Sequence, residues 1–148
     1  MNQLKHLGAY GLILKENKIV LIKKVGGPYN GKLDLPGGTI EFGETPEKTL
    51  KRELNEEVGI DIIDFELFDA NSITLEWMHK EQLEQIHHIG IFYKIFSYKN
   101  NILENINIDE QNDDSKGAKY YDINKLVKNQ LSDIAILEIE KLGYKLKD

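Results

Sequence analysis

Three glutamates, Glu53, Glu56 and Glu57, are spaced so that one helix would carry them on one side. At about 100° per residue they share an arc of about 100°. Glu53 and Glu57 are four residues apart, and like charges at that spacing repel each other mildly even in water. Carboxylates are hard oxygen ligands, so a doubly charged ion such as Mg²⁺ or Mn²⁺ would relieve this repulsion. The competing interpretation, a solvated acidic helix face, remains open from the helix alone.

The helix that carries these glutamates is predicted over 46–58. Thr45 is a favoured N-cap, and Pro46 suits the first helical position. Gly59 is a typical residue for ending a helix. Beside the acids runs an apolar stripe of Leu50, Leu54 and Val58. The glutamates are therefore expected at the edge of the buried face, within reach of a cleft.

A glycine-rich turn, Pro36-Gly37-Gly38, comes shortly before the helix and would let backbone groups approach a ligand closely. Gly38 is followed by Glu44 and then by the run Arg52-Glu53-Leu54-Asn55-Glu56-Glu57-Val58-Gly59-Ile60. This pattern over 38–60 resembles the Nudix box and matches it at every defined position. Outside the box, the chain resembles that family only in its order of elements and in the glycine-rich turn.

The resemblance to the Nudix family implies a fold and a reaction. The fold would be an α/β/α sandwich around a mixed β-sheet. The reaction would be hydrolysis of a nucleoside diphosphate linked to another moiety, by attack of a metal-activated water on phosphorus. The alternative is a Nudix-fold module that senses a nucleotide without cleaving it. Such modules usually lose carboxylates of the box, and all of them are present here.

The resemblance also implies roles for individual residues. Metal would be held by Glu53, Glu56 and Glu57, often with the Gly37 carbonyl as a further ligand. Glu44 would pair with Arg52, the one arginine of the chain, and brace the loop against the helix. Glu53 is our first choice as general base. Some relatives place the base on a later loop, where this chain has Glu104, Asp109, Glu110, Asp113 and Asp114.

Several other positions bear on the substrate. His87 and His88 are neighbours on a predicted strand, so their rings must face opposite sides, and one is expected to pack or to face the substrate. Tyr29 lies in a Gly-rich loop and could stack on a base, although exposed loop tyrosines are ordinary. Positions that mark a substrate class in many relatives lack the marker residue here: Leu33, Leu75, Glu76 and Trp77.

The elements around the box are expected to form one domain over 1–148, and strands with one central helix and terminal helices suggest a mixed sheet covered on both faces. The segment 78–84 is expected to be a charged connection, and 99–117 a long polar loop with a short strand at 102–108. A hairpin is predicted over 7–24, and strands over 33–35, 61–77, 85–98 and 118–123. Further helices are predicted over 123–129 and 132–142.

Composition narrows the function classes. The chain has 148 residues, a net charge of −6 and no cysteine. The missing cysteines exclude disulfides, thiolate metal sites and cysteine nucleophiles. They also disfavour an isoprenoid isomerase of this fold, because the resembling enzymes use a cysteine. The negative charge argues against a broad nucleic-acid-binding surface, and no apolar run has the length of a membrane span. We therefore expect a cytoplasmic enzyme with a small nucleotide-type substrate, and a homodimer is compatible with the sequence.

Overall fold

The computed structural model describes residues 1–102 and 115–148. Its strands are β1 (Asn2–Lys15), β2 (Lys18–Lys24), β3 (Leu33–Asp34), β4 (Gly37–Thr39), β5 (Asp61–His79), β6 (Gln82–Lys99) and β7 (Ser115–Asp122). Its helices are α1 (Pro46–Val58) and α2 (Asp133–Lys141), with the 3₁₀ turns η1 (Ile123–Lys125) and η2 (Lys128–Gln130). Within the described ranges, no helix combines the length and the apolar character needed to cross a membrane.

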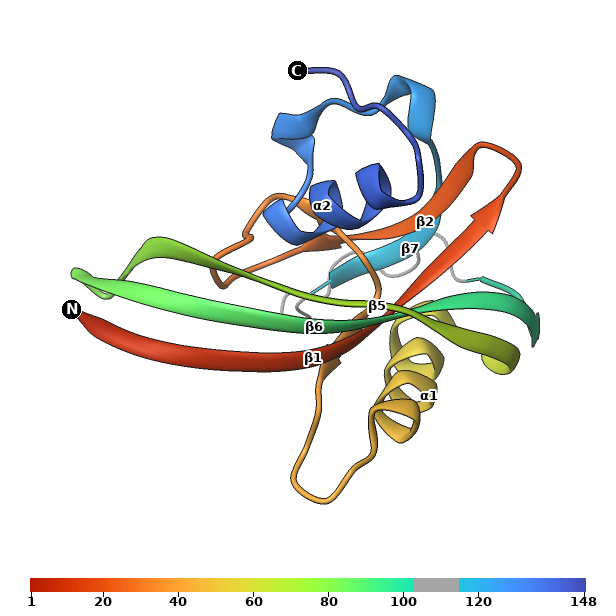
Figure 1. Cartoon of the computed structure of the whole chain (residues 1–148), viewed down its shortest axis with the longest axis horizontal. Coiled ribbons are helices and arrows are strands. Elements are labelled where there is room, and N and C mark those ends of the chain that lie inside the picture. The colour runs from red at the N-terminus through yellow and green to blue at the C-terminus, as the bar shows by residue number, and fades with distance from the viewer. Residues whose placement is uncertain (103–114) are drawn as a thin grey trace.

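The strands form a mixed sheet between two helical layers, which confirms the predicted α/β/α arrangement. The strand order is β3-β2-β1-β6-β5, with β4 paired to β1 and β7 paired to β2. β1 runs parallel to β6, whereas the other pairs are antiparallel. Figure 1 shows α1 and α2 on opposite sides of the sheet. The predicted hairpin and the strands 33–35, 61–77, 85–98 and 118–123 are all present, with shifted ends.

The core has two halves because β1 is buried on both faces. Ala9 and Ile13 point into an apolar cluster with α1. Tyr10 and Leu12 point into a second cluster, which α2 covers. This alternation follows from the two-residue repeat of a strand. A continuous apolar run in the sequence therefore becomes the central layer between the two helices.

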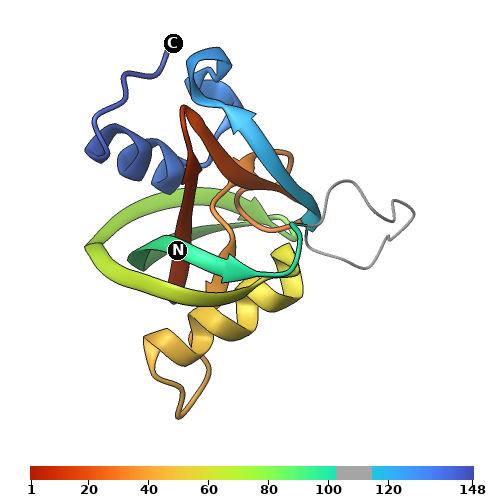
Figure 2. The same cartoon turned by 90° about the vertical axis from the view of Figure 1, so that its right-hand side faces the viewer.

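β5 and β6 are long and strongly bent. The pairing of β5 with β6 shifts register between Ile62 and Phe65 and again between Leu67 and Asp69. Such bulges add an unpaired residue to one strand and increase its bend. Figure 2 shows β5 arching across the molecule between the two helices. This curvature carries Leu75 and its neighbours over one side of the cleft described below.

The prediction for the segment between β5 and β6 was wrong. The segment 78–84 is not a charged connection, since β5 and β6 continue into a two-residue turn at Lys80 and Glu81. Both turn residues have left-handed backbone angles, with φ of 50° and 64°. Such turns usually carry Asn-Gly, so this sequence gives no turn signal. The predicted short strand at 102–108 falls almost wholly outside the described residues.

The segment 123–129 is not an α-helix but two separate 3₁₀ turns. Ile123 and Leu126 are both buried and are three residues apart, which matches the 3₁₀ repeat. Val127 and Leu131 have extended backbone, and Val127 forms a parallel bridge with Lys147. Tertiary pairing therefore overrides the helical pattern here. The predicted helix 132–142 is confirmed as α2, with Ser132 as its N-cap.

A buried carboxyl pair joins α2 to β5. Glu138 is fully buried, and Asn71 donates to its Oε2 at 3.5 Å. Lys141 donates to Asp69 Oδ1 at 2.7 Å. The remaining oxygens, Glu138 Oε1 and Asp69 Oδ2, are buried without partners unless one carboxyl is protonated. Burial, and then the hydrogen bond to Asp69, raises the pKa of Glu138 to about 8.

Raising the pH should therefore destabilise the fold through Glu138. A carboxyl with a raised folded-state pKa contributes full stability below its unfolded value, near 4.5, and loses it as the pH passes about 8. We expect urea unfolding at pH 9 to show a loss of about 1–3 kcal/mol relative to pH 5, because a buried carboxylate is then unsatisfied. Glu138→Gln should remove this component, whereas Glu140→Gln, on the exposed side, should retain it. Identical pH slopes in parent and Glu138→Gln would contradict the assignment.

Candidate active site

The helix predicted at 46–58 forms with those bounds. The Thr45 side chain accepts a hydrogen bond from the Lys48 amide, and Pro46 opens the first turn. Gly59 ends the helix in the left-handed conformation, with φ of 81°. Each signal acts on its nearest neighbours in the chain, so the sequence defines this helix without tertiary information. Its buried stripe then fixes which way its glutamates face.

Glu57 and Glu53 face the glycines of β4. The Gly37 amide donates to Glu57 Oε1 at 2.8 Å. At Gly38, a Cβ atom would lie 2.4 Å from Glu53 Oε2, closer than atoms can approach. The two carboxylates therefore sit against bare backbone, which only glycine at position 38 permits. The glycine-rich turn and the helix together make one wall of a site.

Arg52 ties the loop before α1 to the acidic edge of the helix. Its Nε and Nη2 donate to the two oxygens of Glu44 at 2.9 and 2.8 Å. Its Nη1 donates to Glu53 Oε2 at 3.0 Å, and Nη2 also reaches the Thr39 carbonyl at 3.2 Å. The hydrogen bonds from Arg52 lower the pKa of Glu44 to about 2. The arginine thus orients Glu53 while bracing the turn.

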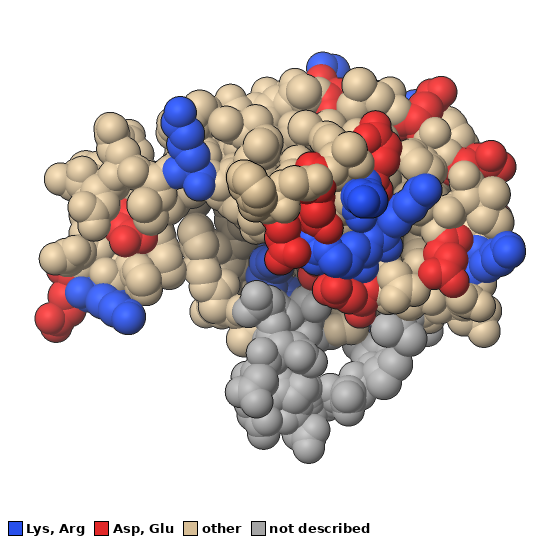
Figure 3. Space-filling model, turned by 90° about the horizontal axis from the view of Figure 1, so that it is seen from below, with Lys and Arg blue, Asp and Glu red and all other residues tan. Residues whose placement is uncertain are grey.

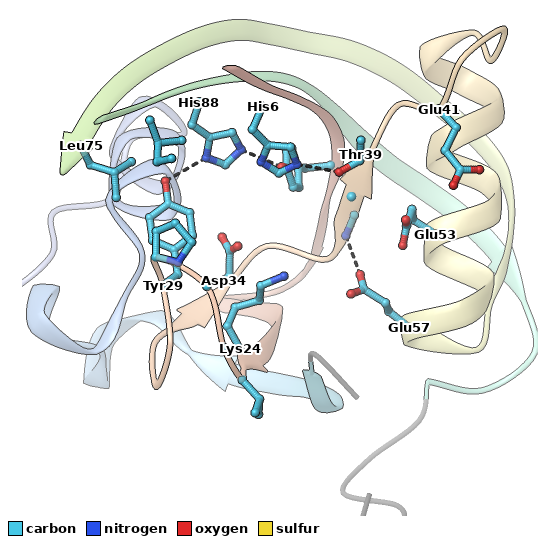
Figure 4. A pocket seen from close by; sticks show the side chains of 18 residues that line it. His6, Lys24, Tyr29, Asp34, Thr39, Glu41, Glu53, Glu57, Leu75 and His88 are labelled. Carbon is cyan, nitrogen blue, oxygen red and sulfur yellow. Dashed lines mark hydrogen bonds between the residues drawn. The ribbon is translucent and has the colours of Figure 1, made fainter. Parts of the chain in front are cut away.

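Glu53 and Glu57, with Gly37 and Gly38, line a cavity of about 420 Å³, within the size range of small-molecule sites. The lining comes from β1, the end of β2, the loop before β3, β3, β4, the loop after β4, α1 and the curved part of β5 and β6 (Figure 4). Among the residues that the structure describes, Lys24 is the one lysine in this lining, which has no arginine. The lining residues are His6, Tyr10, Lys24, Val25, Gly26, Gly27, Pro28, Tyr29, Asp34, Gly37, Gly38, Thr39, Glu41, Glu53, Glu57, Leu75, Ile86 and His88.

In this cavity, ionisation of Glu53 and Glu57 costs free energy. Burial raises the pKa of Glu57 to about 8, and the nearby charge of Glu53 adds to the shift. Burial likewise raises the pKa of Glu53, although Arg52 opposes it. Two close, poorly solvated carboxylates attract a cation, and oxygen ligands suit Mg²⁺ or Mn²⁺. The donor set therefore fits a divalent ion.

The predicted metal ligands do not all meet in this structure. Glu53, Glu57 and Gly37 line the cavity, but Glu56 does not. The Glu56 side chain is 57% exposed and lies 3.7 Å from Arg52 Nη1. Over residues 1–102 and 115–148, no three His, Asp or Glu side chains are grouped closely enough to hold an ion. Figure 3 shows the face that carries α1, where acidic and basic side chains are interleaved.

The structure also places residues that the sequence could not rank. His88 is 2% exposed and lines the cavity, while His87 lies on the other face of β6 beside Lys5 and Gln85. The opposite-face prediction for the two histidines is thus confirmed. Tyr29 is buried and hydrogen-bonded to His88, so it is not an ordinary exposed loop residue. The loop acids from Glu104 to Asp114 lie outside the described residues.

Comparisons with known proteins agree with this geometry. An ADP-ribose pyrophosphatase of Methanocaldococcus jannaschii is 34% identical over 80% of this chain and 62% of its own length. An 8-oxo-dGTP diphosphatase of Escherichia coli is 46% identical over 41% of this chain and 49% of its own. The chain thus spans less than two thirds of either relative.

A solved structure and a family model cover nearly the whole chain. The crystal structure of a MutT NUDIX hydrolase from Burkholderia pseudomallei superposes with a TM-score of 0.71 and 20% identity, covering 94% of this chain and 98% of that one. At that identity the likeness supports the fold. The model of the NUDIX domain matches residues 4–138, which include every box residue and the cavity wall. The chain belongs to the NUDIX domain family.

Proposed function

We propose that this protein hydrolyses a phosphoric anhydride bond in a nucleoside diphosphate linked to another moiety, with Mg²⁺ or Mn²⁺. The observation that carries the proposal is the pair Glu53 and Glu57, packed against the backbone of Gly37 and Gly38 at one end of the cavity. Membership of the NUDIX family supports it. On a merely solvated helix face, the two side chains would point into water and would not pack against these glycines.

The chain's own residues would divide the work. Glu53 and Glu57 would hold the cation, with the Gly37 carbonyl and Glu56 as the further ligands of the family pattern. When bound, the cation lowers the pKa of water and neutralises phosphate oxygens. Glu53 would take the proton from the attacking water, and the Arg52 hydrogen bond holds its carboxylate in place. Glu44 then acts only through Arg52, as a positioning residue.

ADP-ribose is the first substrate to test. The relative named for that activity aligns over 80% of this chain, which includes much of the sheet that builds the cavity. The E. coli relative named for 8-oxo-dGTP aligns over 41%. The apolar part of the lining, including Leu75 and Ile86, comes from β5 and β6 rather than from the box. The longer alignment is therefore the better guide to the substrate.

Product-resolved hydrolysis tests this proposal. The purified protein with Mg²⁺ is expected to convert ADP-ribose into AMP and ribose 5-phosphate, as resolved by ion-pair chromatography. A panel of nucleotide sugars, dinucleoside polyphosphates, nucleoside triphosphates and capped RNA provides the comparison. If another compound of the panel gives product instead, the proposed hydrolase activity stands and that compound replaces ADP-ribose as the substrate. Thermal stabilisation by these compounds without any product would instead support the nucleotide-sensing module.

Arg52→Lys should damage turnover more than folding. A lysine has one nitrogen and cannot span Glu44, Glu53 and the Thr39 carbonyl together, as the guanidinium does. Glu53 is then free to move, and a misplacement near 1 Å costs on the order of 10²-fold in rate. We expect kcat for ADP-ribose to fall by about that factor, with little change in KM. Lys48→Arg, on the exposed side of α1, is the matched control, and parental kcat in Arg52→Lys would refute the positioning role.

Three further expectations stay predictions: that 1–148 is a single domain, that the protein works in the cytoplasm, and that it can form a homodimer. So does the expectation that no broad surface binds nucleic acid. Sedimentation of the purified protein with and without duplex DNA would test the last two.

A further inference from the structure

His88 is held between two tyrosines at the inner wall of the cavity. Tyr10 Oη lies 2.7 Å from His88 Nε2, and Tyr29 Oη lies 2.8 Å from His88 Nδ1. The His6 ring stacks on His88 at 4.8 Å between centroids and is itself hydrogen-bonded to Thr39 Oγ1 at 2.8 Å. Every ring nitrogen of His88 is therefore engaged by a hydroxyl group.

A count of the protons shows that one of the two tyrosine hydroxyl protons is not used in the hydrogen bonds with His88. A neutral imidazole has one N–H donor and one bare acceptor nitrogen, and an imidazolium has no acceptor. His88 can thus accept a hydrogen bond from one tyrosine at most. The other hydroxyl must accept from the imidazole and point its own proton elsewhere. Burial lowers the pKa of His88 to about 3, so the neutral form applies.

The surroundings of the two hydroxyls indicate which proton is free. Tyr10 is 3% exposed, and its Oη packs so closely on Gly8 that a Cβ there would lie 2.3 Å away. Both tyrosines line the cavity, and Tyr10, the more deeply buried of the two, is the costlier place for a hydroxyl proton that lacks an acceptor. Tyr29 is 9% exposed and comes from the glycine-rich loop at the cavity wall. The favoured arrangement has Tyr10 donating to Nε2, and Nδ1–H donating to Tyr29.

The end of the cavity near Tyr29 offers apolar walls to a flat group, beside the buried carboxyl of Asp34 (Figure 4). Figure 4 shows Tyr29, His88 and Leu75 together at one end, with Glu53 and Glu57 at the other. Pro28 and Ile86 add apolar surface to the lining, and the two histidine rings add π-faces. A sugar hydroxyl needs several polar partners, whereas a heteroaromatic base needs apolar walls and few directed hydrogen bonds.

We propose that Tyr29 is a specificity residue, whose hydroxyl donates a hydrogen bond to an acceptor atom on the base of the nucleotide. This role deepens the proposed function, because the carboxylate end of the cavity would then receive the diphosphate. His88 and Tyr10 act through Tyr29 as positioning residues: they fix the hydroxyl oxygen as an acceptor and leave its proton to the ligand.

Binding of AMP tests the proposal without any turnover. Isothermal titration should show AMP binding to Tyr29→Phe about tenfold more weakly than to the parent, as for the loss of one hydrogen bond. Tyr121→Phe, the same change outside the cavity, should bind AMP like the parent. Equal affinity of Tyr29→Phe and parent would overturn the proposal, as would failure of the parent to bind AMP, CMP, GMP and UMP. If the parent hydrolyses none of the substrates but binds AMP in a way that depends on Tyr29, only the proposed function is overturned.

Two further measurements test the proposal, and the second of them needs the parent protein alone. The 1-, 3- and 7-deaza analogues of AMP each lack one ring acceptor. One of them should bind the parent more weakly than AMP does, while Tyr29→Phe should bind that analogue and AMP equally well. If each of the three analogues changes the affinity of both proteins by the same factor, the proposal is overturned. In the parent, ¹⁵N–¹H spectra of the imidazole should show the His88 proton on Nδ1. A proton on Nε2 would also overturn it.

Discussion

Glu57→Gln and Glu53→Gln are each expected to lower kcat for ADP-ribose by a factor on the order of 10²–10⁴. Glutamine keeps the size of the side chain and, at position 57, an oxygen that can accept the Gly37 amide proton. It removes the negative charge that would hold a divalent ion and, at position 53, the base. Initial rates of AMP formation at saturating Mg²⁺ measure the effect.

Stability separates loss of chemistry from loss of fold in these variants. Burial raises the pKa of Glu57, so the glutamine variant should unfold without added metal at a temperature no lower than the parent. Mg²⁺ or Mn²⁺ should raise the unfolding temperature of the parent, because a ligand that binds only the folded state stabilises it. Glu57→Gln should lose this response. A variant that keeps both parental kcat and the metal response would refute the proposed site.

Two other glutamates sharpen the comparison. Glu66→Gln changes an exposed residue of β5 and should leave kcat unaltered. Glu56 belongs to the family pattern but lies outside the cavity, with its side chain 57% exposed. If Glu56→Gln lowers kcat as far as Glu57→Gln does, its side chain must turn toward the ion on binding. A small effect would mean that Glu53 and Glu57 carry the metal with backbone and water.

The part of the site that could be predicted from the sequence is the part built from local signals. Thr45, Pro46 and Gly59 act on their neighbours, so both ends of α1 were predicted correctly. The spacing of the glutamates within α1 then follows from the helical repeat. The two-residue turn at Lys80 and Glu81 was missed because it lacks the glycine or asparagine that usually marks such a turn.

The His88 contacts belong to the part that the sequence could not provide. Tyr10 and Tyr29 are 78 and 59 residues away from His88 along the chain. Their meeting depends on the parallel pairing of β1 with β6, in which Tyr10 lies opposite Phe92. The alternation of a strand predicts that His87 and His88 face opposite sides, but not which face closes on the loop that carries Tyr29. The proposed base-recognition site therefore depends on long-range pairing, whereas the proposed metal-binding edge depends on local sequence.

Gly38→Ala is expected to lower kcat by on the order of 10²-fold while leaving the fold nearly as stable as the parent. The new Cβ would lie 2.4 Å from Glu53 Oε2 and 2.6 Å from its carboxyl carbon. Both atoms are at the far end of a flexible side chain, so the carboxylate can swing away without moving the backbone. The backbone of Gly38 lies outside the left-handed region and accepts alanine. Only the position of the carboxylate should change.

Gly37→Ala is the matched comparison, in which the expected effect falls on the stability of the fold. Its Cβ would meet the Ala9 carbonyl oxygen at 2.1 Å, and its φ of 145° disfavours any side chain. Backbone cannot swing aside as a carboxylate can, so the pairing of β4 with β1 must distort and the unfolding temperature should fall. Urea unfolding and initial rates on both variants separate the two cases. If Gly38→Ala unfolds as readily as Gly37→Ala, or turns over ADP-ribose like the parent, then the close approach of Glu53 to bare backbone is not what holds the carboxylate for chemistry.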